Sequence, residues 1–77
     1  LLFYDGPPDY AERRLPFRAA HFAHTRAAVA RGELLLGGAY ADPVDGAVLL
    51  FECDSPAPVE AFAKSDPYVT NGVVTRW

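Results

Sequence analysis

The segment from Ala47 to Cys53 constrains the fold most, because a strand here would be apolar on both faces. Side chains alternate along a strand, so residues 47, 49, 51 and 53 face one way and residues 48, 50 and 52 the other. Glu52 is the one charged residue in the segment. An antiparallel sheet with one face in water alternates more clearly. We therefore expect helices to cover one face and a second copy of the chain to cover the other.

Turn and cap residues divide the rest of the chain into short elements. Strands are expected over 1–5, from Leu34 onward, over 47–53 and over 73–77, with a hairpin loop at 42–46. Helices are expected over about 16–31, with Gly32 as its stop, and over 56–65, with Ser55 as its cap. Shorter helical turns are expected at 10–15 and after Asp66-Pro67, the second stopped by Asn71-Gly72.

The predicted order is β-α-β-β-α-β, which is a ferredoxin-like split βαβ arrangement of the α+β class. It consists of a four-stranded antiparallel sheet with both helices on one face. A chain of 77 residues has no third layer to cover the other face. A homodimer, formed as a sandwich or barrel of two sheets, is the simplest arrangement that covers it.

Composition excludes several classes of function. The formal net charge of −3 argues against nucleic acid, because phosphate binding needs a basic face. No stretch approaches the roughly twenty apolar residues of a membrane span, and the opening residues lack the basic leader of a signal peptide. The single cysteine, Cys53, cannot form an internal disulfide. We expect a cytoplasmic protein without a membrane partner.

Helical periodicity separates two lines of residues on the helix expected over 16–31. The expected core stripe consists of Leu15, Ala19, Phe22 and Val29. A second line at spacings of four, three and four consists of Arg14, Arg18, His21 and Thr25, whose side chains can neighbour one another. His21 is thus expected at the edge of the core, where a cleft can form. His24 lies away from this line and is expected outside or at a subunit contact.

Asp66 is expected to cap the turn that begins at Pro67, and the same carboxylate can accept a hydrogen bond from an imidazole N–H. A histidine oriented by a carboxylate is a common general base. The alternatives stay open: His21 as a helix residue with a satisfied hydrogen bond, Asp66 as a cap alone, and Arg18 as a solvated charge. Tyr68 can add a hydroxyl or a ring to the pocket wall. No metal site or cofactor is expected, since the two histidines have no third ligand nearby.

Three blocks of sequence resemble the YCII-related proteins. They are residues 13–24, residues 32–38, and residues 62–68 with Gly72 after them. The resemblance covers nearly the whole chain and implies a single domain over 1–77, with a few residues missing at both ends. It also implies a dimeric α+β barrel with a presumed active site on a histidine and an aspartate, which fall on His21 and Asp66.

These observations favour a small enzyme that needs no cofactor. His21 would be the acid or base, Asp66 its orienting partner and Arg18 an anion partner, with Arg14, Thr25 and Tyr68 beside the substrate. The resemblance implies elimination or isomerisation chemistry on a small ring compound, so the expected substrate is acidic or phenolic. The alternatives are a ligand-binding or accessory module without catalysis and a purely structural dimerisation domain.

Overall fold

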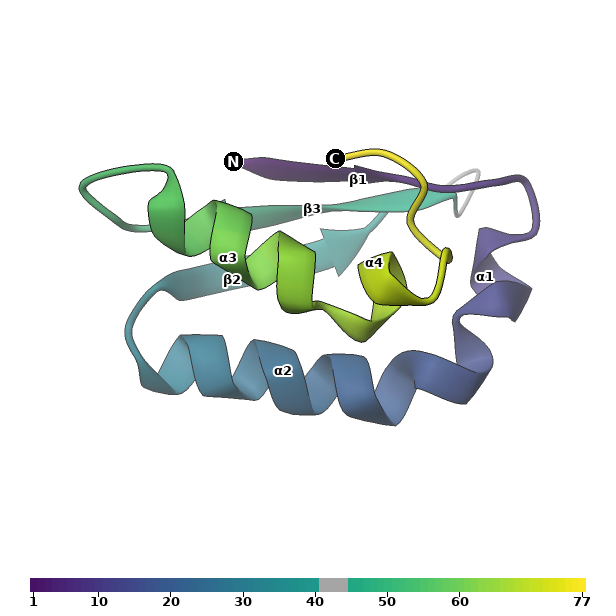
Figure 1. Cartoon of the computed structure of the whole chain (residues 1–77), viewed down its shortest axis with the longest axis horizontal. Helices are drawn as coiled ribbons and strands as arrows, with labels where there is room; N and C mark the ends of the chain where they lie inside the picture. The colour runs from purple at the N-terminus through teal and green to yellow at the C-terminus, as the bar shows by residue number, and fades with distance from the viewer. Residues whose placement is uncertain (41–44) are drawn as a thin grey trace.

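A three-stranded antiparallel sheet with helices on one face frames the protein (Figure 1). This computed structural model describes residues 1–40 and 45–77. The strands are β1 (Leu2–Asp5), β2 (Leu34–Ala39) and β3 (Gly46–Phe51), in the spatial order β1-β3-β2. β3 therefore lies in the centre of the sheet and pairs with both neighbours. The predicted loop at 42–46 lies mostly outside the described residues.

The described residues form five helical segments where four were expected, because the helix expected over 16–31 begins as a separate 3-10 turn. They are α1 (Tyr10–Arg13), the 3-10 turn η1 (Leu15–Phe17), α2 (Arg18–Ala30), α3 (Ala57–Ser65) and α4 (Pro67–Thr70). Gly32 and Gly72, at φ 76° and 74°, take the left-handed conformation that ends α2 and α4. The expected cap at Ser55 is wrong, because α3 begins after Pro56 with no side-chain cap bond.

The strand predicted over 73–77 is not formed in the structure. Val73 and Val74 turn into the core, and the Val74 N–H donates to the Tyr68 carbonyl instead of to a strand. Thr75 and Arg76 reach the end of β1, where the N–H groups of both donate to the Asp5 carbonyl and Arg76 forms a single antiparallel bridge with Asp5. The C-terminal segment thus lies beside β1 without extending the sheet (Figure 1). The split βαβ order with four strands is not observed, and the fold is mixed α+β.

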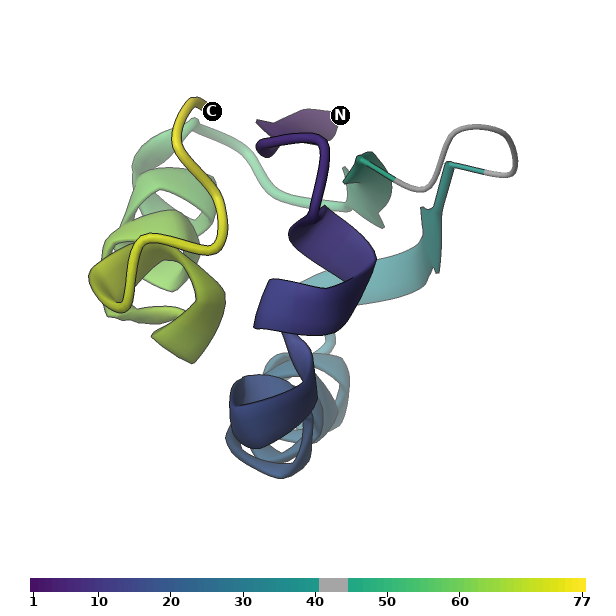
Figure 2. The same cartoon turned by 90° about the vertical axis from the view of Figure 1, so that its right-hand side faces the viewer.

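The core lies between the sheet and the helices (Figure 2). Its largest fully buried side chains are Tyr4, Tyr10, Phe62, Val73 and Asp66. In β3, Leu49 faces this core and is buried, whereas its neighbour Leu50 faces away and is exposed. The outer face of the sheet therefore carries apolar side chains that residues 1–40 and 45–77 leave exposed.

The predicted core stripe of α2 is wrong. Leu15, Phe22 and Val29 are 62%, 42% and 54% exposed, and Ala19 is exposed as well. The buried residue of α2 is Ala28, and both histidines lie half-buried on the inward side. The side of α2 that carries the histidines faces α3 and α4, because His21 and His24 find hydrogen-bond partners there, at Asp66 and at the Phe62 carbonyl.

The backbones of β1 and β3 approach closely at Gly46. A Cβ atom added to Gly46 would collide with the Tyr4 carbonyl oxygen and would lie 2.7 Å from the Tyr40 ring. Only glycine fits this approach without a shift of one strand.

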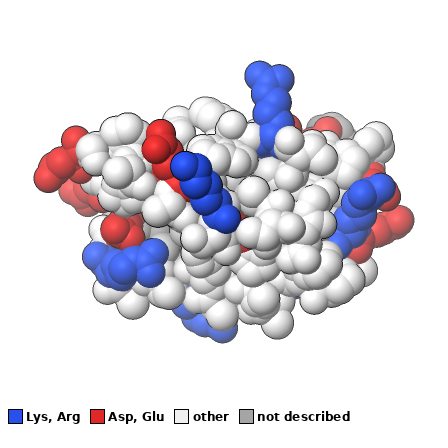
Figure 3. All heavy atoms as spheres, in the orientation of Figure 1, with Lys and Arg blue, Asp and Glu red and all other residues white. Residues whose placement is uncertain are grey.

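Charged side chains of both signs are scattered over the face shown in Figure 3. No helix in the described part of the chain has both the length and the hydropathy needed to span a membrane.

Candidate active site

One line of side chains runs from the end of α1 along α2 into a pocket. Arg14, Arg18, His21 and Thr25 follow one another at the predicted spacing, and all four line the pocket. They share a face because residues three and four apart lie one above another on a helix. The predicted neighbourhood of these four residues is confirmed.

Asp66 sits at the junction of α3 and α4 and is completely buried. Its backbone is extended, and its Oδ1 accepts a hydrogen bond from the Tyr68 N–H at 3.0 Å. Pro67 follows at the first helical position, where its missing N–H costs nothing. The predicted cap is confirmed, and it directs a carboxylate into the interior of the domain.

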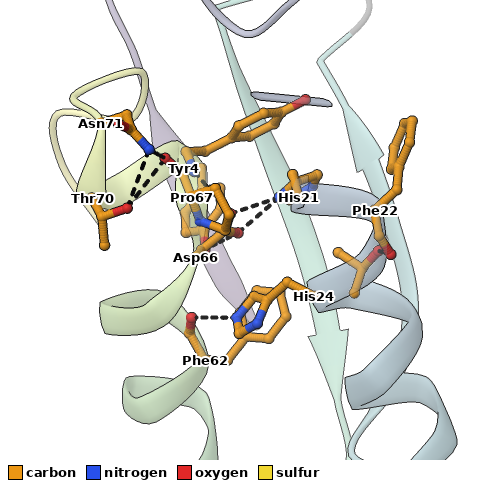
Figure 4. A network of polar contacts seen from close by, with 11 residues as sticks. Tyr4, His21, Phe22, His24, Phe62, Asp66, Pro67, Thr70 and Asn71 are labelled. Carbon is orange, nitrogen blue, oxygen red and sulfur yellow. Dashed lines mark hydrogen bonds and ion pairs between the residues drawn. The ribbon is translucent and has the colours of Figure 1, made fainter. Parts of the chain in front are cut away.

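His21 and Asp66 are in direct contact. The Nδ1 atom of His21 lies 2.8 Å from Oδ1 and 2.9 Å from Oδ2 of Asp66 (Figure 4). An ionised carboxylate can only accept hydrogen bonds, so Nδ1 is the donor here. The imidazole then carries its proton on Nδ1 and leaves Nε2 free to meet a ligand. The His21 side chain is 13% exposed, which allows such contact from the pocket.

The Tyr68 ring packs against the His21 imidazole. The two rings are stacked, with centroids 3.9 Å apart and planes 6° apart. Tyr10 meets the Tyr68 ring edge-on, at 6.2 Å. Burial raises the pKa of Tyr68, although the Arg14 and Arg18 guanidinium groups oppose the shift. Burial also raises the pKa of Tyr10, to about 12. Both phenols therefore remain hydroxyl donors at neutral pH.

The pocket has a volume of about 400 Å³ and lies between α2 and the edge strand β2. Its walls combine aliphatic and aromatic side chains with a polar end. The apolar lining includes Phe22, Val29, Leu34, Leu35 and Leu49. The polar end is formed by Tyr10, Arg14, Arg18, His21 and Tyr68. This combination suits a small ring compound that carries an acidic group.

Two guanidinium groups are available at the polar end. Arg14 Nε is buried and has no hydrogen-bond partner among the described residues. The Arg14 guanidinium lies over the Tyr10 ring at 5.7 Å, and that of Arg18 lies over the Phe22 ring at 5.1 Å. A buried donor without a partner is costly, and a bound anion would satisfy it.

His24 does not belong to the pocket, and its expected peripheral position is wrong. Its Nε2 lies 2.8 Å from the Phe62 carbonyl oxygen, and its ring stacks on the Phe62 ring at 4.3 Å. Figure 4 shows the two histidines with separate partners. His24 is therefore a packed, hydrogen-bonded residue that joins α2 to α3.

Sequence reasoning missed Tyr4. Its hydroxyl donates to Asp66 Oδ2 at 2.8 Å, from the strand at the other end of the chain. A signal was present, because a tyrosine at an inward position of a strand needs a polar partner for its hydroxyl. Nothing in the sequence indicated which partner it would find.

Among residues 1–40 and 45–77, no group of three or more histidine, cysteine or acidic side chains is placed to hold a metal ion. Cys53 is exposed, and it is not part of the pocket lining.

Comparisons with known proteins address the fold. The YCII-related domain matches residues 1–77. A search of curated proteins found no significant match. The structure is similar to that of 5-chloro-2-hydroxyhydroquinone dehydrochlorinase (TftG) from Burkholderia phenoliruptrix AC1100, solved in complex with 2,5-dihydroxybenzoquinone. The TM-score is 0.80 at 23% identity, over 97% of this chain and 88% of that one.

Proposed function

This chain belongs to the YCII-related family, and on that premise we propose that it is a small acid–base enzyme that works without a cofactor. The observation that carries the proposal is the 2.8 Å contact between His21 Nδ1 and Asp66 at the wall of a pocket. An imidazole held in this way presents Nε2 as a base, and the carboxylate stabilises the imidazolium that forms.

The proposed chemistry is elimination or isomerisation. In both, Nε2 of His21 takes a proton from the substrate. In an elimination, the electrons of the broken bond form a new double bond, and the leaving group departs with the electron pair of its own bond. In an isomerisation, His21 returns the proton to another atom of the substrate. Arg14 and Arg18, which line the pocket, would stabilise negative charge on a substrate oxygen.

The proposed substrate is a small ring compound with an acidic or phenolic oxygen. Apolar side chains would hold the ring, while the guanidinium groups and the hydroxyls of Tyr10 and Tyr68 would bind its oxygen. The name of the structural neighbour, a dehydrochlorinase in complex with 2,5-dihydroxybenzoquinone, agrees with this class of substrate.

We also propose a cytoplasmic homodimer, joined through the outer face of the sheet. Phe3 and Leu36 on that face are 52% and 69% exposed in the single chain, and Leu50 between them is also exposed. An apolar area of this kind marks an interface. The free, exposed Cys53 suits a reducing compartment.

Two compounds test the function. Purified protein is titrated with 2,5-dihydroxybenzoquinone, and chloride release is measured with 5-chloro-2-hydroxyhydroquinone. We expect binding and turnover, and we expect His21→Ala to lower turnover by about 10²–10⁴-fold, the usual contribution of a positioned base. Arg18→Gln should weaken binding of the quinone. The matched control is Arg26→Gln, a change of an exposed arginine on the same helix that does not line the pocket.

The possible results separate the alternatives. Binding of the quinone, together with no turnover of 5-chloro-2-hydroxyhydroquinone or of a panel of phenolic and carboxylic ring compounds, would contradict the proposed enzyme function. It would support a ligand-binding module. Equal weakening by Arg18→Gln and Arg26→Gln would contradict the anion site. Full turnover by His21→Ala would contradict the role of the histidine.

A further inference from the structure

Tyr4 reaches the His21–Asp66 pair from the opposite end of the chain. It lies on β1, faces the core and is completely buried. Its hydroxyl donates to Asp66 Oδ2 at 2.8 Å, and Figure 4 shows Tyr4, Asp66 and His21 together. Tyr4 does not line the pocket itself.

The two oxygens of Asp66 each have one fixed donor. Oδ1 accepts the Tyr68 N–H at 3.0 Å, and Oδ2 accepts the Tyr4 hydroxyl at 2.8 Å. With both oxygens held, the plane of the carboxylate is set, and His21 Nδ1 lies at nearly equal distances from the two oxygens. Without the Tyr4 hydroxyl, one fixed donor would remain, and the carboxyl group could rotate about its Cβ–Cγ bond.

The Tyr4 hydroxyl keeps its proton in this position. Burial, followed by the nearby negative charge of Asp66, raises the pKa of Tyr4 far above its ordinary value. Tyr4 therefore remains a donor and does not take up a proton from the pair. The other ionisable groups nearby are those of Tyr10, Tyr68, Arg14 and Arg18, and none of their side chains is hydrogen-bonded to Asp66 in the described residues.

We propose that Tyr4 is a positioning residue of the site: it fixes the Asp66 carboxylate so that His21 carries its proton on Nδ1 and offers Nε2 to the substrate. This inference rests on the proposed function for its catalytic meaning. Its structural content, the tautomer of His21, can be measured in the ligand-free protein.

The test compares Tyr4→Phe with wild type and with Tyr40→Phe, which removes a hydroxyl outside the pocket. The ¹⁵N shifts of the His21 ring are measured where the imidazole is neutral. We expect the Nδ1–H tautomer in wild type and Tyr40→Phe, and a clear rise of the Nε2–H tautomer in Tyr4→Phe. Turnover should fall by up to roughly 100-fold in kcat, with a smaller change in KM, as expected for a misplaced base.

A folded Tyr4→Phe protein with the wild-type tautomer would overturn the inference. If Tyr4→Phe does not fold, the wild-type protein decides: deuteration of the Tyr4 hydroxyl should shift the His21 Nδ1–H resonance, and the absence of a shift would overturn it. If His21→Ala keeps full turnover, the proposed function fails, but the tautomer still tests Tyr4. If only Tyr4→Phe is without effect, the proposed function stands and this inference fails.

Discussion

Asp66 combines the roles of helix cap and hydrogen-bond hub in one buried side chain. Its carboxylate accepts from the Tyr68 N–H, the Tyr4 hydroxyl and His21 Nδ1. A buried carboxylate is tolerated when donors surround it in this way. The same three bonds join β1, α2 and α4, so the residue that orients the imidazole also holds the elements of the site together.

We predict that Asp66→Ala lowers the free energy of unfolding by about 3 kcal/mol or more, because two fully or nearly buried donors lose their acceptor. Urea unfolding followed by circular dichroism measures the change. Asp9→Ala is the control, since the Asp9–Arg13 ion pair is exposed and should contribute little. A similar small change in both variants would contradict the role of Asp66 as a hub.

Part of this site could be predicted from the residues. An aspartate before Pro67-Tyr68 predicts a cap, and the spacing of Arg14, Arg18 and His21 predicts a shared face; both are confirmed. The Tyr4 contact could not be predicted, because its partner is 62 residues away and strand position alone selects no acceptor. The catalytic role of the pair remains a prediction.

At the scale of elements, α2 shows that apolar periodicity can mark a face other than the core. Phe22 and Val29 line the pocket and are about half exposed, whereas Ala28 is buried and the two histidines are half-buried. The histidine side is buried because each imidazole has an acceptor: Asp66 for His21 and the Phe62 carbonyl for His24. The periodicity of the sequence shows which face of a helix is apolar, but it does not show partners that lie far away in the chain.

The orientation of α2 leads to a comparison of two phenylalanines. Phe62→Ala should cost about 3–5 kcal/mol, because this ring is almost fully buried between Phe51 and His24. Phe22→Ala should cost about 1 kcal/mol or less, because the ring is 42% exposed. Urea unfolding of the two variants checks both values. Equal destabilisation by the two changes would mean that α2 packs Phe22 into the core, as its apolar stripe predicted.

At the scale of the whole molecule, the helices cover one face of the sheet, and the described residues leave the other, apolar face uncovered. The prediction of apolar residues on both faces of β3 is confirmed, since Leu49 is buried by helices and Leu50 is exposed outward. The fourth strand is not formed. Val73 and Val74 after Gly72 are typical strand residues, but in the structure they pack into the core. Their burial depends on the position of α4, which local sequence does not specify.

The uncovered face predicts a dimer that buries more than about 1,000 Å² in total. Analytical ultracentrifugation at micromolar concentration should give twice the 8.4 kDa mass of the chain. Phe3→Asp, on the outer face, should give monomers. Leu15→Asp is the matched control on the helical side: Leu15 is 62% exposed, against 52% for Phe3, and we expect its change to leave the dimer intact. Monomeric wild type, or dissociation by both variants, would contradict this interface.

The close approach of β3 to β1 at Gly46 links the sheet to the chemistry. Any side chain at position 46 would push against the Tyr4 carbonyl, and Tyr4 is the residue whose hydroxyl reaches Asp66. In a mutational scan, substitutions of Gly46 would then lower the measured activity, although Gly46 does not line the pocket and has no side chain that could react. In the proposed enzyme, selection on activity would thus extend to a glycine whose only contribution is the absence of a side chain.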